Sequence, residues 1–130
     1  MRFDPNHLPQ SVLDFLTERH LATLSTLRAD GTLHVVPVGF SWDDRTKTAR
    51  VITRAHSTKV RNLSSGTARA ALSQVDGGRW LTLEGVARVA NDAETIALAV
   101  QGYSSRYRPP AERDDRVALE IRVDHVMGRC

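Results

Sequence analysis

The segment RAHSTKVRN, residues 54–62, brings basic and hydroxyl side chains close together. Its cations are Arg54, Lys59 and Arg61, and its hydroxyl groups come from Ser57 and Thr58. If a helix begins near Ser57, its first backbone N–H groups and its positive dipole end add to the same place. Hydroxyl groups, cations and free N–H groups are the donors that bind phosphate. The spacing therefore predicts an anion site, most suitably for a phosphate.

A second interpretation of this segment stays open. Val60 and Leu63 lie three residues apart, which places them on one face of a helix that could pack on the core. The segment would then be a capped amphipathic helix whose cations are simply solvated. Runs of charge usually solvate a surface, so composition alone favours this plainer interpretation.

Three other features carry possible chemistry. His34 lies between apolar neighbours, where it either donates to a ligand or serves as an ordinary strand histidine. Pro37 cannot donate to a β-ladder, so its strand is expected to have an edge or a bulge there. The segment SRYRPPAERDDR, residues 105–116, either guides an acidic ligand or forms a solvated loop; its arginines are Arg106, Arg108, Arg113 and Arg116.

Several familiar signatures are absent from the sequence. It contains no G-x-G-x-x-G after a strand, no G-x-x-x-x-G-K-[ST] and no G-x-S-x-G. Its five histidines are scattered and have no cysteine nearby in metal-ligand spacing, so no metal site is expected. If the protein is an enzyme, we expect a cofactor to carry the reaction.

The elements that must position these residues are mostly strands. Alternating apolar and polar residues, bounded by Asp-Gly turns, predict strands at 21–27, 33–42, 49–54, 68–75, 79–90 and 116–123, with a bend or bulge at Gly85. Helices are predicted at 11–20, from Ser57, and from Asn91 to the Pro109-Pro110 stop, and Ser11 with Asp14 and Asn91 with Glu94 have capping-box spacing. The pattern indicates a mainly β (α+β) protein: six antiparallel strands curled into a small barrel with short helices outside.

Composition limits the classes of protein. The 130 residues suffice for one domain, residues 1–130, with 41% hydrophobic residues and a net charge of +3. Cys130 is the single cysteine, so an intrachain disulfide is excluded and a reducing, cytoplasmic location is expected. No apolar run approaches the length of a membrane span, and the aromatic content of 5% argues against nucleic-acid binding.

Two segments carry a resemblance to a known family. LATLSTLRADGTLHVVPVGFSWD and ARVITRAHSTKVRNL, with the motifs D-G-x-x-H-x-x-P-V and S-x-K-x-R-N-L, resemble the pyridoxamine 5′-phosphate oxidase-like split β-barrel family. Within it, the chain is similar to the branch that uses the deazaflavin coenzyme F420. The later segments SQVDGGRWLTLEGVARV and VMG resemble the F420-dependent biliverdin reductases of that branch.

The resemblance implies a homodimer with a cofactor in each of two grooves between the chains. His34, Val36, Pro37 and Val38 would face the deazaflavin ring, and Ile52 and Thr53 would line the ribityl chain. Ser57, Lys59 and Arg61 would hold the phosphate, and Arg106 or Arg108 would meet substrate propionates. No side chain is implied as covalent or catalytic.

The function implied is hydride transfer from reduced coenzyme F420 to a planar conjugated acceptor, biliverdin or a related tetrapyrrole. Two alternatives remain open. One is a flavin mononucleotide (FMN) oxidase or reductase on the same barrel, because FMN also combines a ring with a phosphate. The other is a protein that binds the coenzyme or a tetrapyrrole without turnover.

Overall fold

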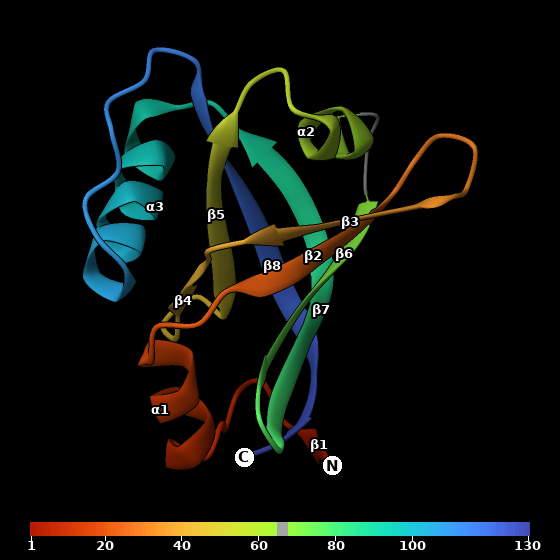
Figure 1. The fold of residues 1–130 in the computed structure, drawn as a ribbon, viewed down its shortest axis with the longest axis vertical. Coiled ribbons are helices and arrows are strands. Elements are labelled where there is room, and N and C mark those ends of the chain that lie inside the picture. The colour runs from red at the N-terminus through yellow and green to blue at the C-terminus, as the bar shows by residue number, and fades with distance from the viewer. Residues whose placement is uncertain (65–67) are drawn as a thin grey trace.

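The computed structural model describes residues 1–64 and 68–130, which form one antiparallel sheet and three helices (Figure 1). The strands are β1 (Arg2–Phe3), β2 (Ala22–Leu27), β3 (Leu33–Val38), β4 (Ser41–Asp43), β5 (Thr48–Arg54), β6 (Ala68–Asp76), β7 (Arg79–Ala90) and β8 (Arg116–Arg129). The helices are α1 (Gln10–Thr17), α2 (Thr58–Leu63) and α3 (Ala93–Arg106). The strand order is β3-β2-β6-β7-β8-β5-β4, and β1 pairs with β8.

The sheet curls around one hydrophobic core. Figure 1 shows β2 and β3 crossing steeply over β5, β7 and β8, so the two ends of the sheet approach each other. Alternate residues point inward, as in β2, where Ala22, Leu24 and Thr26 are buried. No pairing joins β3 to β4 among the described residues, so the barrel stays open along that seam. The expected mainly β, split-barrel fold is confirmed.

The strand count differs from the expected six. The predicted strand at 33–42 is two strands, because the chain leaves the β2 edge after Val38 and pairs with β5 from Ser41. β1 has only two residues, too few for a sequence pattern to reveal it. It pairs with β8 as far as Met127. Pro37 lies in an end strand of the sheet, which confirms the expected edge.

The turns and the bulge follow the sequence closely. Gly31 and Gly77 have positive φ angles of 85° and 61° in the two Asp-Gly turns. Gly85 lies at the one register shift between β7 and β8, and Asp124 is the extra residue of the bulge. A Cβ atom at Gly85 would lie 2.0 Å from the Arg122 carbonyl oxygen, so only glycine fits there.

Two predicted helix caps are wrong by one or two residues. The N-cap of α1 is Pro9, with no side-chain hydrogen bond, instead of Ser11. The N-cap of α3 is Asp92 instead of Asn91, and its carboxylate accepts a hydrogen bond of 3.0 Å from the Thr95 N–H. Ser57 does cap α2, as expected, by accepting from the Val60 N–H at 3.4 Å.

The three helices lie on different parts of the barrel. α1 buries Val12, Phe15 and Leu16 in the main core, while α3 contributes Ala99 to a small second cluster with Ala90 and Ala118. α2 closes the end where the predicted phosphate site lies, and it buries Val60 and Leu63. In the described ranges, none of these helices is both long and apolar enough to cross a membrane.

Candidate cofactor-binding groove

A cavity of about 350 Å³ lies beside the open seam, where β3, β5, α2 and α3 come together with the segment that precedes β8. Its lining residues are Pro37, Val38, Gly39, Ile52, Thr53, Arg54, Lys59, Tyr103, Pro110, Arg113 and Arg116. Apolar side chains from the strands meet four cations there, and no Asp or Glu lines it in the described part of the chain. Such a wall suits a planar ligand with an anionic end.

Five of the nine predicted cofactor residues line this cavity: Pro37, Val38, Ile52, Thr53 and Lys59. They come from two strands that are not neighbours in the sheet and from one helix, so only the fold brings them together. The other four, His34, Val36, Ser57 and Arg61, do not line it. Val36 packs against the hydrophobic core, which is the reason for its absence from the cavity wall.

The hydroxyl and the helix start that the sequence suggested contribute less than expected. The Ser57 hydroxyl already accepts the Val60 N–H, and it lies 3.4 Å from the Thr53 hydroxyl. α2 has only six residues, so its dipole is short. Arg61 is exposed, and its guanidinium donates to the Thr58 hydroxyl at 3.3 Å instead of entering the cavity. The positive charge of the cavity therefore comes from its cationic side chains, and Ser57 serves as a helix cap.

Lys59 is the predicted phosphate residue that the structure does place in the cavity. Its side chain is half-buried, and no Asp or Glu lies within ion-pair distance of it among the described residues. Burial lowers the pKa of its ammonium group, and the charge of Arg54 lowers it further. An anion in the cavity would relieve both effects.

Two backbone edges face the seam beside the cavity. β3 is an end strand, and β4 pairs with β5 only between Thr48 and Arg50. In the described residues, β5 from Val51 to Arg54 therefore has a strand partner on one side only, β8. Unpaired backbone N–H and C=O groups at such edges can hydrogen-bond the polar rim of a ring.

His34 lies close to this region without lining the cavity. Its side chain is on the inward face of β3, directly opposite the buried Thr26, whose hydroxyl accepts from Asn62 at 3.0 Å. The His34 Nδ1 atom is buried and has no hydrogen-bond partner among the described residues. A buried orphan nitrogen of this kind is unusual and is consistent with a nearby ligand that would reorient the ring.

The prediction that Arg106 binds a substrate propionate is corrected by its surroundings. Arg106 is only 8% exposed, and its guanidinium donates to the carbonyls of Glu18 and Phe40 and to the Gln74 side chain at 2.8–2.9 Å. It also stacks 4.6 Å from the Phe40 ring centre. Arg106 is therefore a structural residue. Arg108 is exposed and lies outside the cavity wall, so its predicted role stays a prediction.

The structure adds residues that sequence reasoning had not assigned to the cofactor. Arg113 reaches the cavity from the segment before β8, Arg116 from the start of β8, and Tyr103 from α3. Tyr103 and Tyr107 stack with ring centres 4.9 Å apart above Gly39, where an added Cβ would lie 3.0 Å from the Tyr103 ring. The arginine-rich segment was recognisable in the sequence as a possible binding segment, but its position relative to Lys59 depends on the register of β8 against β5.

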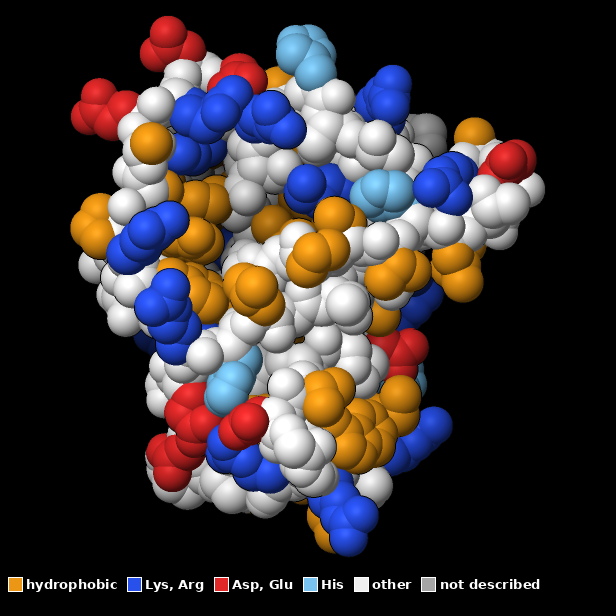
Figure 2. All heavy atoms as spheres, viewed as in Figure 1, with side chains coloured by type: hydrophobic (Ala, Val, Ile, Leu, Met, Phe, Trp, Pro, Cys, Tyr) orange, Lys and Arg blue, Asp and Glu red, His pale blue; other side chains and the backbone are white. Residues whose placement is uncertain are grey.

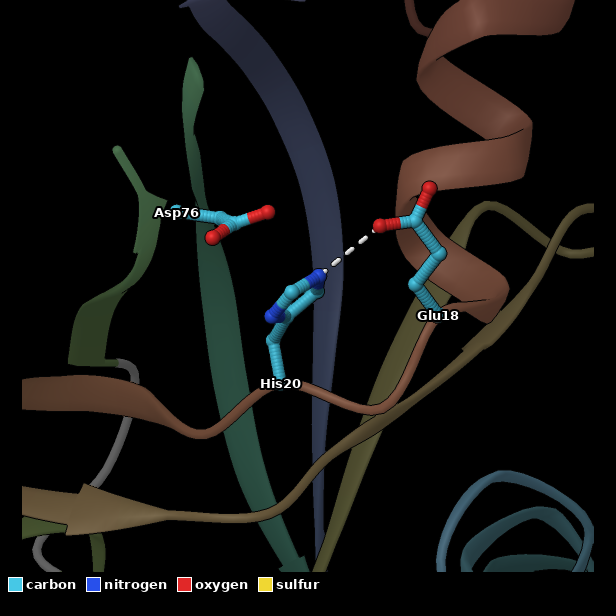
Figure 3. Close-up of side chains that lie close together, drawn as sticks. All are labelled: Glu18, His20 and Asp76. Atoms are coloured by element: carbon cyan, nitrogen blue, oxygen red, sulfur yellow. Dashed lines mark hydrogen bonds and ion pairs between the residues drawn. The ribbon is translucent and has the colours of Figure 1, made fainter. Parts of the chain in front are cut away.

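A separate cluster joins Glu18, His20 and Asp76 (Figure 3). The His20 Nε2 atom lies 2.9 Å from a Glu18 carboxylate oxygen, and Asp76 faces the same space. Arg79 donates to both carboxylates and, with a smaller contribution from His20, lowers the pKa of Glu18 to about 2. Because a guanidinium already neutralises the acids, we interpret the cluster as an ion-pair network that fastens the β6–β7 hairpin to the end of α1.

A larger hollow of about 480 Å³ lies between α1, β4 and α3, away from the cationic cavity. Two carboxylates there offset most of the charge of its three arginines: Asp43 accepts from Arg50 at 3.0 Å, and Asp44 accepts from Lys47 at 2.9 Å. Paired charges leave little net attraction for a charged ligand. The smaller cavity, with four cations and no Asp or Glu in its described lining, is therefore the candidate site for an anionic cofactor.

An open antiparallel barrel with a cationic cavity at its seam defines the class of this protein as a split β-barrel. The family model for pyridoxamine 5′-phosphate oxidase matches residues 8–130, and the chain belongs to this family.

Individual relatives narrow the comparison. The chain is 48% identical over 121 residues to the F420H(2)-dependent biliverdin reductase of Mycobacterium tuberculosis, an alignment that covers 93% of this chain and 88% of the relative. A solved structure of an F420 reductase matches with a TM-score of 0.74 and 26% identity, covering 92% of this chain and 98% of that one. A conserved hypothetical protein of M. tuberculosis has a TM-score of 0.79 at 22% identity, covering 94% and 84%, and it supports the fold alone.

Proposed function

We propose that this protein is a coenzyme F420-dependent reductase that converts biliverdin, a planar tetrapyrrole. The observation that carries the proposal is the cavity at the seam, where four cations meet an apolar wall next to two open strand edges. The 48% identity to an F420H(2)-dependent biliverdin reductase over nearly the whole chain supports the same activity. The oxidoreductase and the cofactor predicted from the sequence agree with this relative and with the F420 reductase structure.

The residues present suit a deazaflavin with a phosphate. Lys59 and Arg54 supply positive charge for the phosphate at one end of the cavity. Pro37, Val38 and Ile52 supply an apolar wall against which a flat ring can pack and from which water is excluded. When bound in its reduced form, coenzyme F420 supplies a hydride. The chain's part is to orient the two planar molecules and to hold their negative charges.

We also propose that the protein works as a homodimer, and the outer face of β2, β3 and β6 supports this. Five large apolar side chains there are 53–66% exposed: Leu21, Leu27, Leu33, Val35 and Val75. Leu27 lies opposite Leu33 in the sheet, and Leu21 follows the same register opposite Val75. Figure 2 shows hydrophobic side chains gathered over β2 and β3, below the Lys and Arg side chains near α2.

A second copy of this chain is the occupant that this apolar face suits best. The face carries hydroxyl and small side chains between the apolar ones, such as Thr23, Ser25 and Ser73, which allow two sheets to approach closely. Pro37 belongs both to this face and to the cavity wall, so the interface would continue directly into the cofactor groove. The single Cys130 also fits a reducing, cytoplasmic setting.

The test of function is a titration of the purified protein, in separate experiments, with oxidised coenzyme F420 and with FMN, followed by the fluorescence of each ligand. We expect tighter binding of coenzyme F420. Oxidation of the reduced coenzyme should then depend on added biliverdin and be slow without it. Preference for FMN would assign the chain to the flavin enzymes, and saturable F420 binding without biliverdin-dependent turnover would make it a binding protein.

A further inference from the structure

We propose that Arg113 and Arg116 form a second anion subsite, next to Lys59, that binds a carboxylate group of the ligand. The inference rests on the proposed function and names two residues that the sequence left as either a guide for an acidic ligand or a solvated loop. Both line the same cavity as Lys59 and Arg54. They come from the C-terminal part of the chain, whereas Arg54 and Lys59 come from its first half.

The first support is an unfavourable placement of charge. Arg54 of β5 and Arg116 of β8 are direct cross-strand partners in the antiparallel pair. Like charges directly opposite each other on a sheet repel and are destabilising unless something compensates them. No Asp or Glu lies within ion-pair distance of either arginine in the described residues, so an anionic ligand is the natural source of compensation.

The second support is the balance of charge in the cavity. Four cations line it, Arg54, Lys59, Arg113 and Arg116, and no carboxylate does in the described part of the chain. Asp115, beside the cavity, pairs with Arg113, and a single phosphate carries at most about two negative charges, so about one positive charge remains uncompensated after it binds. The ligand must therefore bring further negative charge. Arginine is well suited to carboxylates because its planar fork donates two parallel hydrogen bonds.

The third support is the way the arginine segment is held. Asp115 accepts a hydrogen bond from the Arg113 Nε at 2.9 Å and a longer one from its Nη2 at 3.2 Å. The backbone carbonyl of Asp115 accepts from the Ala55 N–H at 2.8 Å, which fastens this segment to the end of β5. Arg116 donates to the Ala111 carbonyl within the same segment. The Asp115 carboxylate and the Ala111 carbonyl thus hold the two guanidinium groups before any ligand binds.

Asp115 also gives the subsite an internal competitor. Arg113 holds the pKa of this carboxyl below its usual range, so the group is ionised at neutral pH. A ligand carboxylate that pairs with Arg113 must replace Asp115 or share the guanidinium with it. Removing the negative charge of Asp115 should therefore strengthen ligand binding, whereas removing either arginine should weaken it. A purely structural role of the loop would make all three changes act in the same direction.

Two sources can supply the carboxylate: the acidic tail of the coenzyme or the propionates of biliverdin. The experiment measures dissociation constants for the parent protein and for Arg113→Ala, Arg116→Ala and Asp115→Asn. The probes are oxidised coenzyme F420 with its glutamate tail, the same deazaflavin phosphate without glutamates, biliverdin, and biliverdin dimethyl ester. Arg122→Ala is the matched control, because Arg122 lies on the same strand as Arg116, is exposed and does not line the cavity.

We expect each arginine variant to weaken binding of one carboxylate-bearing probe by roughly 5-fold to 30-fold and Asp115→Asn to strengthen it by about 2-fold to 5-fold, while the matching probe without carboxylates is unaffected. The pair of probes in which only the carboxylate-bearing member loses affinity identifies the source of the carboxylate. Equal effects on probes with and without carboxylates, no effect on any probe, or an equal effect of the control Arg122→Ala would overturn the subsite. If the parent binds neither form of the coenzyme, the proposed function fails, and the two biliverdin probes still decide the subsite.

Discussion

At the scale of single residues, the cavity is defined by its four cations, of which only Arg113 has an acidic partner among the described residues. Lys59 is half-buried beside Arg54, and burial, followed by the charge of Arg54, lowers the pKa of its ammonium group. The other lysine of this protein, Lys47, pairs with Asp44, and Arg69 and Arg79 likewise pair with Asp124 and Glu18. Lys59 departs from that pattern where a bound phosphate would restore the balance of charge.

Replacing this one lysine should weaken cofactor binding specifically. We expect Lys59→Ala to reduce the affinity for oxidised coenzyme F420 by about 1.5–3 kcal/mol, the scale of a charge-assisted hydrogen bond. The thermal unfolding temperature should change little, because the lysine has no partner to lose. Arg61→Ala, on the same helix but outside the cavity, is the control and should bind like the parent. Equal affinities for Lys59→Ala and the parent would return α2 to a purely structural role.

The same lysine should make cofactor binding depend on pH. Because its pKa is lowered from the ordinary value of 10.5, Lys59 loses its proton at a lower pH than an exposed lysine does. Affinity for the anionic coenzyme should therefore fall as pH rises through this lowered value, which a binding titration across the alkaline range measures. Lys59→Arg, whose guanidinium stays charged, should lack that step. A parent protein with constant affinity across the range would contradict the assignment.

The stability of the ligand-free protein should change with pH in the direction opposite to that of cofactor affinity. The folded state binds the Lys59 proton less tightly than the unfolded state does, because the pKa is lower when the protein is folded. The unfolding free energy contributed by this group therefore increases as pH rises from the folded pKa toward 10.5. Affinity and stability would thus move in opposite directions over one pH window.

At the scale of elements, Arg106 joins pieces that are distant in sequence. It is the last residue of α3. Its guanidinium donates to the Glu18 carbonyl at the end of α1, to the Phe40 carbonyl between β3 and β4, and to the Gln74 side chain of β6. Tyr107, the next residue, donates to the His20 carbonyl at 2.6 Å. These contacts hold the end of α3, and so the start of the arginine-rich segment, against the barrel.

Truncation of Arg106 should therefore act on stability. We expect Arg106→Ala to lower the unfolding free energy by about 2–5 kcal/mol, because three buried acceptors lose their donors at once. Denaturant unfolding of Arg106→Ala and of the neighbouring control Arg108→Ala makes the comparison, and the control should stay within about 0.5 kcal/mol of the parent. A stable Arg106→Ala protein with a raised KM for biliverdin would instead support the role predicted from the sequence.

At the scale of the whole molecule, one face of the barrel remains apolar while the opposite parts are covered by helices. The apolar face of β2, β3 and β6 continues through Pro37 into the cofactor groove. Exposed apolar patches of this kind mark association surfaces in soluble proteins. Assembly and cofactor binding should therefore be coupled in this protein.

A charge placed on that face should separate the subunits. We expect Val35→Lys to shift the protein from dimer to monomer in sedimentation experiments and to weaken coenzyme F420 binding at least several-fold, because a buried unpaired charge at an interface is strongly unfavourable. Leu98→Lys is the control: Leu98 is 43% exposed on α3, outside the apolar face, and its replacement should leave both properties unchanged. A monomeric parent protein would contradict the proposed assembly.

The local features of this protein could be predicted from its sequence because they depend on neighbouring residues. Alternating burial marked most strands, Asp-Gly pairs marked two turns, and Gly85 marked the bulge. Ser57 was expected at the start of α2, and it is the N-cap. The motif around Lys59 predicted an anion site, and its resemblance to a family predicted the cofactor. These are consequences of side-chain period, backbone conformation and charge, all of which act over a few residues.

Only the tertiary structure decided which charges share a space. Arg106 and Arg113 lie seven positions apart in one basic segment, yet one is buried under α1 and β6 while the other lines the cavity. Likewise, His34 and Pro37 belong to one strand, but only Pro37 reaches the cavity wall. The register of β8 against β5 and the crossing of the chain from β3 to β4 set these outcomes. Such pairings join residues far apart along the chain, and the burial of the whole core determines them, so no local pattern of residue types could reveal them.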